Sequence, residues 1–247
     1  MSPGKRYLLT GASSGIGAAL ARELAAKGYD LALAARREDG LHLLAAELQS
    51  RFGNRVVVLP LDVTDYAACQ EAVNVAANAL GGLDGIIANA GIALTGKAGG
   101  GYFDRAKRTV ETNLIGAIAC LDAACALFRQ QGYGHLVAVA SVAGKRGLPH
   151  TAAYSASKAG LISYMEATRA ELLGKHIDTT LLLPGFIDTP LNSDMPSRPF
   201  LISVERGAAL IAQHIEQRTP SAYVPGWPWA LLGRVLPYLP TTVIGKF

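Results

Sequence analysis

The segment Thr10-Gly-Ala-Ser-Ser-Gly-Ile-Gly17 decides the fold, because it places three glycines between a short apolar strand and a helix. Gly11 permits a tight turn, Gly15 lets the backbone approach a diphosphate, and Gly17 lets the helix pack closely on the sheet. The helix N-terminus offers free N–H groups and a partial positive charge to an anion. An ordinary glycine turn is the alternative, since the spacing is not the commoner Gly-x-Gly-x2-Gly. The position directly after an N-terminal strand favours nucleotide binding.

Outward from this segment, strand and helix patterns alternate along all 247 residues, and no linker marks a second domain. Apolar or β-branched runs predict the strands, and amphipathic segments predict the helices. The predicted strands are residues 7–10, 30–35, 56–61, 84–88, 134–140 and 177–183, and the predicted helices are 15–27, 38–52, 65–80, 104–130, 154–173 and 203–217. This order predicts an α/β fold, a Rossmann-type doubly wound parallel sheet in three α/β/α layers and a single domain.

Composition excludes several functional classes. Half of the residues are hydrophobic and 17% are charged, which is typical of a compact globular protein. The net charge of +4 is scattered, so we expect no nucleic-acid partner. The three cysteines, Cys69, Cys120 and Cys125, lack metal-site spacing, so we expect no metal. Cys120 and Cys125 lie in an apolar helical stretch and are interpreted as buried reduced thiols. No signal-like segment precedes the first strand and no uninterrupted apolar stretch reaches ~18–20 residues, so we expect a cytoplasmic protein.

The ends of three predicted strands carry candidate cofactor contacts. After the second strand the chain reads Arg36-Arg37, without the carboxylate that would hold a ribose 2′-hydroxyl. A guanidinium suits a 2′-phosphate, so the sequence predicts NADP(H); two solvated arginines are the alternative. Asp62 and Asn89 follow the next two strands. Asp62 could hold the adenine amino group or could simply stabilise a turn.

Tyr154 and Lys158 stand four residues apart in a predicted helix and therefore share one face. At ~4 Å and an effective dielectric of ~20, the attraction between a phenolate and an ammonium is roughly 4 kcal/mol. We therefore expect Lys158 to lower the pKa of Tyr154 toward neutrality. Such a tyrosine, in a chain with a nucleotide loop, indicates hydride transfer.

Taken together, these motifs resemble the short-chain dehydrogenase/reductase family over residues 5 to about 190. The resemblance is carried by Thr10–Gly17, Asp62-Val63, Asn89-Ala90-Gly91, Asn113, Ser141, Tyr154-x3-Lys158 and Pro184-Gly185 with Thr189.

The resemblance implies four catalytic residues. Tyr154 would be the general acid in carbonyl reduction and the base in alcohol oxidation. Ser141 would orient the substrate oxygen, Lys158 would bind the nicotinamide ribose, and Asn113 would hold a water for proton relay. Each has a plainer alternative: Ser141 could cap a turn, Asn113 could bond backbone in its helix, Lys158 could be solvated and Tyr154 could be a half-buried ring.

The resemblance also implies a set of cofactor contacts. The Pro184-Gly185 segment would surround the nicotinamide carboxamide, with Ile187 and Thr189 as contacts. The full expected set is Gly11, Ser13, Ser14, Gly15, Ile16, Gly17, Arg36, Arg37, Asp62, Val63, Asn89, Ala90, Gly91, Tyr154, Lys158, Pro184, Gly185, Ile187 and Thr189.

The C-terminal part departs from the family. Many members end in a strand and a Val-Asp-Gly-Gly tail that helps to build a tetramer, and this chain does not. Residues 220–247 instead form an apolar tail rich in proline that holds both tryptophans, Trp227 and Trp229. The tail could cover the substrate pocket, contact a partner subunit in a homodimer or other homo-oligomer, or lie on a membrane, the last being the least favoured because prolines forbid one continuous amphipathic helix.

The substrate loop and the competing functions complete the prediction. Residues 188–200 are interpreted as a mobile substrate loop whose apolar side chains hint at an acyl, lipid-like or steroid-like ketone. We expect an NADP(H)-dependent carbonyl reductase or alcohol dehydrogenase. The alternatives are a catalytically idle dinucleotide-binding regulator, an NAD-dependent alcohol dehydrogenase, and an epimerase or dehydratase, for which little C-terminal chain remains.

Overall fold

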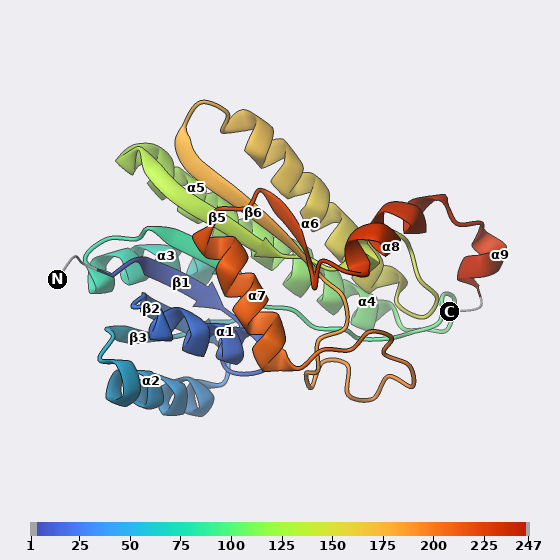
Figure 1. Ribbon diagram of the computed structural model, residues 1–247, viewed down its shortest axis with the longest axis horizontal. Helices are drawn as coiled ribbons and strands as arrows, with labels where there is room; N and C mark the ends of the chain where they lie inside the picture. Colours follow the sequence, from blue (N-terminus) through green and yellow to red (C-terminus); the bar gives the residue numbers. More distant parts are fainter. Residues whose placement is uncertain (1–3, 246–247) are drawn as a thin grey trace.

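A seven-stranded sheet forms the centre of the computed structural model, which describes residues 4–245 (Figure 1). Its order is β3-β2-β1-β4-β5-β6-β7, and every pairing is parallel. The strands are β1 (Arg6–Thr10), β2 (Asp30–Ala35), β3 (Val56–Pro60), β4 (Gly85–Ala88), β5 (Tyr133–Val139), β6 (His176–Pro184) and β7 (Ser221–Val224). The predicted doubly wound α/β sheet is confirmed.

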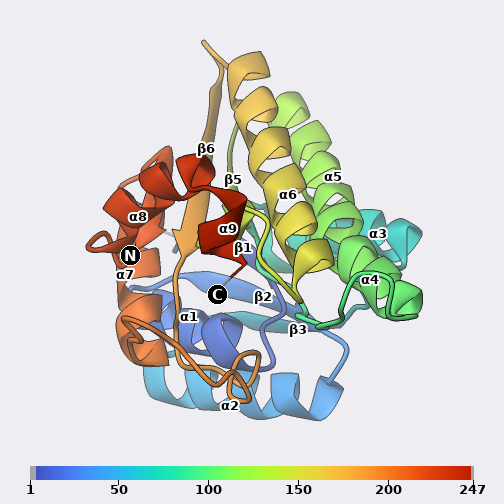
Figure 2. The ribbon, with the colours of Figure 1, turned by 90° about the vertical axis from the view of Figure 1, so that its right-hand side faces the viewer.

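Helices cover both faces of the sheet, as Figure 2 shows. One face is covered by α1 (Gly15–Ala26), α2 (Glu38–Phe52) and α7 (Val204–Glu216), and the other by α3 (Tyr66–Leu80), α4 (Phe103–Val110), α5 (Ala117–Gln131) and α6 (Ala152–Glu171). Because both faces are covered, the inner strands β1, β2, β4 and β5 are buried almost throughout, which explains their apolar composition. The hydrophobic core is accordingly split into one cluster on each side of the sheet.

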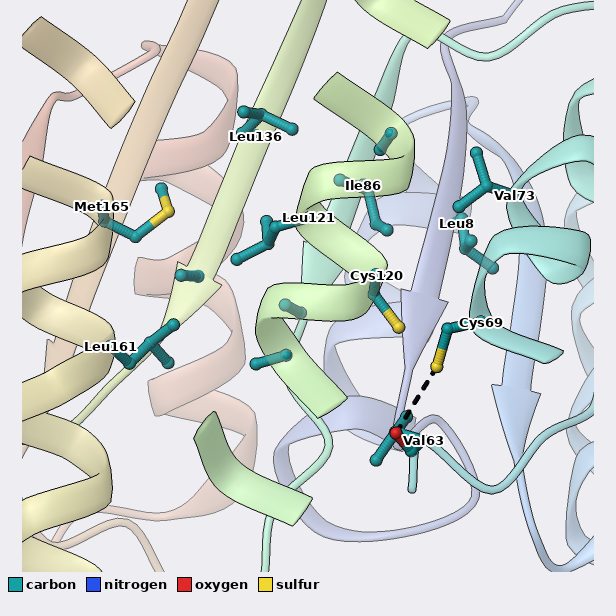
Figure 3. Packing of buried hydrophobic residues seen from close by; sticks show 14 of the residues in the cluster. Leu8, Val63, Cys69, Val73, Ile86, Cys120, Leu121, Leu136, Leu161 and Met165 are labelled. Carbon is teal, nitrogen blue, oxygen red and sulfur yellow. Dashed lines mark hydrogen bonds between the residues drawn. The ribbon is translucent and has the colours of Figure 1, made fainter. Parts of the chain in front are cut away.

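Figure 3 shows the packing between α3, α5 and the sheet. Cys69 and Cys120 point toward one another between the two helices, and both are buried. The thiol of Cys69 donates a weak hydrogen bond to the carbonyl of Val63 at 3.5 Å. The prediction of a buried thiol is confirmed for Cys120, whereas Cys125 is only half-buried.

Two features of the chain differ from the expectation. The prediction that the chain lacks the family's final strand is wrong, because β7 pairs with β6 from Ser221 to Val224. A strand of four residues ending at a proline leaves little pattern to detect. The predicted long helix is also not regular: a π-helical segment, η1 (Glu111–Gly116), separates α4 from α5.

The continuous helical run Phe103–Gln131 spans 29 residues and reaches a mean hydropathy of 1.5 over 18 residues. By length and composition alone it could cross a membrane. It packs, however, against α3, α6 and strands β4 and β5. It is therefore placed as a core helix of this sheet, which explains its apolar composition.

After β7, the tail folds back onto the domain as α8 (Trp229–Val235), η3 (Leu236–Tyr238) and α9 (Thr241–Ile244). Residues 246 and 247 of the predicted tail lie outside the described residues. In Figure 2, α8 and α9 lie over the edge of the sheet at which the strands end. Arg146, in the loop after β5, donates to the carbonyl of Leu239 at 3.1 Å. The tail therefore reaches across this edge from β7 to the loop before α6.

Candidate active site

The predicted site residues come together at the carboxyl edge of the sheet, where ligands bind in open α/β folds. The loops after β1, β2, β3, β4, β5 and β6 each contribute, although they are spread over 180 residues of sequence. The view in Figure 2 looks onto this edge.

The glycine loop joins β1 to α1 and leaves no room for side chains. Gly11 has a φ of +69°, and a Cβ there would lie 2.8 Å from the Cα of Ala90. A Cβ on Gly17 would lie 2.2 Å from the carbonyl oxygen of Gly11. Ser14 starts α1 without a capping bond from its side chain, and the first turn contains no acidic residue. The N–H groups at this end therefore remain suited to an anion.

Asn89 ties the end of β4 to the glycine loop. Its amide nitrogen Nδ2 donates to the carbonyl of Thr10 at 3.0 Å and of Gly11 at 3.4 Å. In return, the hydroxyl of Thr10 accepts from the backbone N–H of Asn89 and of Ala90, both at 3.1 Å. Thr10 was not predicted as a site residue, but these bonds set the position of both loops.

Arg37 lies directly at the glycine loop. Its Nη2 donates to the hydroxyl of Ser14 at 2.5 Å and to that of Ser13 at 3.2 Å. The guanidinium is exposed and close to the N-terminus of α1. This corner therefore combines hydroxyl groups and a fixed cation with the helix start.

Arg36 points instead toward Asp62 at the end of β3, with Nη1 and Oδ2 separated by 3.8 Å. Both side chains are largely exposed, so the pair contributes little to stability. Burial acts to raise the pKa of Asp62, but hydrogen bonds from Thr64 and the charge of Arg36 outweigh it and lower that pKa. Asp62 is thus a carboxylate that accepts from the backbone and side chain of Thr64. Beside it, Val63 is buried in the core.

Lys158 is buried and bonded to the sheet. Its Nζ donates to the carbonyl of Val139 at 2.9 Å, and only 4% of the residue is exposed. Burial lowers the pKa of Lys158 to about 8. The ring of Tyr154 lies beside it, with Nζ 5.9 Å from the ring centroid. The predicted pairing on one helix face is therefore present.

The predicted lowering of the tyrosine pKa is wrong for this structure. The pKa of Tyr154 is raised because the ring is withdrawn from water, and the hydrogen bond with Ser141 acts in the opposite direction without overcoming it. The physical reason is that the ammonium of Lys158 is engaged by Val139 rather than held against the phenol. At neutral pH, Tyr154 therefore carries its proton.

Ser141 follows β5 and begins the short helix η2 (Val142–Gly144). Its hydroxyl accepts from the N–H of Ala143 at 3.1 Å, so the turn-capping role considered from the sequence is present. The bond that it donates, to the carbonyl of Pro184, is 3.5 Å long and weak. Ser141 also hydrogen-bonds with Tyr154, so the two hydroxyl groups lie together where a substrate oxygen would bind.

Asn113 lies inside the π-helical segment and is fully buried. Its Oδ1 accepts from the N–H of Ile92 at 2.8 Å, and its Nδ2 donates to the carbonyl of Ile92 at 2.8 Å and to Ser157 at 3.3 Å. It thus bonds a neighbouring loop and α6 rather than its own helix. A Cβ on Gly91 would lie 3.4 Å from its Oδ1 and 3.6 Å from Nζ of Lys158, so these groups surround one point.

The segment after β6 passes over the glycine loop. Methyl Cγ2 of Thr189 would be 3.4 Å from a Cβ on Gly15. Ile187 is 1% exposed and packs against Gly207 of α7, so only its backbone could face a cofactor. Ile16 is partly buried against the same cluster. The loop is braced by Asn192, which donates to the carbonyl of Ile187 at 2.9 Å.

Trp229 of α8 forms a wall of this region that sequence reasoning did not assign to the site. A Cβ on Gly185 would lie 2.2 Å from the indole, which also packs edge-to-face on Phe186 and on Phe200 of the 188–200 loop. The indole N–H is buried without a hydrogen-bond partner among residues 4–245. The tail therefore packs against the segment that follows β6 and against the 188–200 loop.

The comparison with known proteins agrees with this arrangement. The sequence profile of the short chain dehydrogenases matches residues 5–199. The chain belongs to the short-chain dehydrogenase family. It is similar to an uncharacterized oxidoreductase of Mycobacterium tuberculosis, with 40% identity over 245 residues, 98% of this chain and 97% of the relative.

Solved structures share the fold over nearly the whole length. A putative short-chain alcohol dehydrogenase from Sinorhizobium meliloti superposes with a TM-score of 0.83 at 28% identity, covering 92% of this chain and 97% of the other. An alcohol dehydrogenase from Thermococcus sibiricus, complexed with 5-hydroxy-NADP, gives 0.81 at 26% identity over 89% and 95%. This short-chain dehydrogenase is thus an oxidoreductase by family.

Proposed function

We propose that this short-chain dehydrogenase is an NADP(H)-dependent enzyme that reduces a carbonyl group or oxidises the corresponding secondary alcohol. The observation that carries the proposal is the grouping of Ser141, Tyr154 and Lys158 at the end of β5, beside the glycine loop. When bound, the dinucleotide supplies or accepts the hydride. The rest of the chemistry is a proton transfer, which falls to the side chains.

The glycine loop fits a dinucleotide on its own geometry. Glycine at positions 11 and 17 allows β1 and α1 to approach closely, and no carboxylate in the first turn of α1 opposes an anion. Arg37, held by Ser13 and Ser14, would bind a 2′-phosphate, and Asp62 would accept from the adenine amino group. Lys158 would bind the ribose on the nicotinamide side, and the backbone of Ile187 with Thr189 would hold the carboxamide.

Tyr154 would act as the general acid in reduction, because its hydroxyl carries a proton at neutral pH and hydrogen-bonds with Ser141. Ser141 would donate its weakly engaged hydroxyl hydrogen to the same substrate oxygen and orient it. Asn113 would be a positioning residue, because its hydrogen bonds hold the loop at Ile92 and helix α6 together around Lys158. This state favours reduction near pH 7.

Tyr154→Phe tests the proton-transfer role. We expect it to retain NADPH binding and to lose 10²–10⁴-fold in kcat with a carbonyl panel, the usual contribution of a general acid. Tyr164→Phe, a half-buried tyrosine further along α6, is the matched control and should keep its activity. Retention of more than about a tenth of kcat in Tyr154→Phe would contradict the role.

Cofactor selectivity needs its own test, because Arg36 is paired with Asp62 in this structure and this pairing favours NAD as the alternative. We expect NADPH to bind at least tenfold more tightly than NADH, since a charge-assisted hydrogen bond contributes roughly 1.5–3 kcal/mol. Arg37→Ala and Arg36→Ala should reduce this ratio, and Arg51→Ala at the far end of α2 should not. Equal dissociation constants for the two dinucleotides would support the NAD alternative.

We also propose a homo-oligomer. Large apolar side chains remain exposed on the helical layer, with Leu173 just after α6 at 76% and Ile115 at 39%. Burying them against a second copy would remove apolar surface from water. Light scattering of the purified protein should give at least twice the chain mass of 25.8 kDa.

A further inference from the structure

A cavity of about 300 Å³ lies beside the start of α6. This volume is at the lower end of the range that small-molecule sites occupy. Its walls come from the loop before α4, from the first turns of α4 and from the segment that leads into α6; they include Leu94, Lys97, Tyr102, Arg105, His150 and Ala153. In Figure 2, the loop that leads into α4 passes beside the start of α6.

The walls of this cavity carry basic groups and no carboxylate. Lys97 and Arg105 contribute cations, and His150 contributes an imidazole. Asp104 is the nearest acidic residue in sequence, but it does not line the cavity. Within residues 4–245, none of the three basic side chains takes part in an ion pair. An anion entering here would therefore meet cations that no carboxylate of the described residues neutralises.

The cavity has a defined shape, because its two sides are bonded to each other. The N–H of Gly96 donates to the carbonyl of His150 at 2.9 Å, which joins the two loops. The guanidinium of Arg105 stacks on the ring of Tyr102, 4.9 Å from its centroid, and donates to the carbonyl of Thr95 at 3.3 Å. The cation is thus held in place before a ligand arrives, which reduces the entropy lost on binding.

The cavity lies at the start of α6, the helix that carries the proposed catalytic residue Tyr154. Ala153, on its wall, is the residue directly before Tyr154. On the other side, Leu94 follows the loop in which Ile92 is bonded to Asn113. A substrate whose carbonyl lies at Tyr154 would have to extend past Ala153 to reach the cavity. The loop of residues 188–200 carries the exposed ring of Phe200, which packs on the buried indole of Trp229.

We propose that this cavity binds an anionic end group, a carboxylate or a phosphate, of the carbonyl substrate. The proposal rests on the proposed function for the reaction and adds the class of substrate. The substrate is then an oxo acid or an oxo phosphate ester with an apolar portion directed toward Trp229. Lys97 and Arg105 determine specificity by contact with this group.

The test compares three substrates that share one carbon skeleton: an aliphatic oxo acid, its methyl ester and the corresponding oxo phosphate. Each substrate is assayed with three forms of the enzyme: wild type, the double variant Lys97→Gln/Arg105→Gln, and the control Lys107→Gln. Lys107 lies on the same helix as Arg105 but contacts Glu111 and does not line the cavity. Steady-state NADPH oxidation gives kcat and KM for each pair.

We expect wild type to prefer one of the two anions over the ester at least tenfold in kcat/KM, the size of one charge-assisted contact. The double variant should lose this preference through a higher KM with kcat unchanged, and it should retain its rate with the ester. Lys107→Gln should behave as wild type. Which anion is preferred distinguishes a carboxylate site from a phosphate site.

Equal use of the ester and both anions by wild type would overturn the proposal, as would a double variant that loses the same factor with ester and anion. If none of the three ketones supports NADPH oxidation, the proposed reaction fails for this carbon skeleton. A binding measurement then tests the cavity independently of the reaction. Saturation-transfer NMR with NADP⁺ present should then show contact from the anion and not the ester, abolished in the double variant. Equal signals from wild type and the double variant would overturn the proposal.

Discussion

His135 on β5 forms a buried polar link at the opposite end of the sheet from the active site. One ring nitrogen lies 2.8 Å from the hydroxyl of Tyr7 on β1, and the other lies 2.8 Å from that of Thr180 on β6. The side chain is fully buried, and burial together with the nearby charge of Arg218 lowers the pKa of His135 from 6.5 to about 3. In the folded protein it is therefore neutral throughout the mildly acidic range.

Lowering the pH should destabilise the fold through this residue. Once the chain unfolds, His135 regains a pKa near 6.5 and takes up a proton that the folded state does not bind until about pH 3. Its contribution is thus fully present above pH 6.5 and is lost progressively as the pH falls toward 3. From these two pKa values, the loss between pH 7 and pH 5 is about 2 kcal/mol in the free energy of unfolding.

Urea unfolding of wild type and His135→Gln at pH 7, 6 and 5, at constant ionic strength, measures this term. The glutamine does not titrate, so the variant, whatever its stability at pH 7, should lose about 2 kcal/mol less than wild type between pH 7 and 5. All other titrating groups cancel in the difference. His176→Gln, an exposed histidine at the start of β6, should retain the wild-type dependence. Parallel pH dependences for wild type and His135→Gln would refute the reasoning.

Two further substitutions test the packing around the site. Gly185→Ala should lower the free energy of unfolding by about 1–3 kcal/mol, because its Cβ would lie 2.2 Å from the indole of Trp229. The control Gly226→Ala, where a Cβ would have no atom within 4 Å, should change the melting temperature little. Equal melting temperatures for the two variants would disprove the close contact. Asn113→Ala should cost about 2 kcal/mol, measured by urea unfolding, because it leaves buried partners unbonded, while exposed Asn74→Ala on α3 should be neutral. Similar losses in both asparagine variants would argue against the buried link.

Local chemistry made much of the fold and of the site predictable from the sequence. At two positions of the glycine loop, Gly11 and Gly17, a side chain would clash with backbone atoms, so glycine is required there. Ser141 and Asn89 directly follow predicted strands, so the ends of those strands determine where they lie. These are requirements of short segments, so one sequence is enough to detect them. In the structure, the glycine loop, Ser141 and Asn89 lie at the carboxyl edge of the sheet, as predicted.

Contacts between distant segments could not be predicted in the same way. Trp229 reaches Gly185 and Phe200 only after the chain has returned through β7, and no local pattern encodes that meeting. The pKa of Tyr154 also depends on a contact between distant segments, the hydrogen bond from Lys158 to β5. Helix spacing brings Lys158 near the ring, but the carbonyl of Val139, 19 residues earlier, takes its ammonium. Proximity along a helix therefore did not determine the direction of the shift.

The π-helical segment Glu111–Gly116 sets the angle by which α4 is rotated about the helix axis relative to α5. Each residue of a regular helix advances the chain by about 100°, so shortening this segment by one residue would rotate everything before it relative to everything after it by roughly that angle. Arg105 lies before the segment and Cys120 beyond it, packed in the core. With α5 anchored, such a deletion would swing Arg105 away from its cavity while leaving the sheet intact. The length of one irregular turn thus fixes how the outer wall of the substrate region is oriented to the interior.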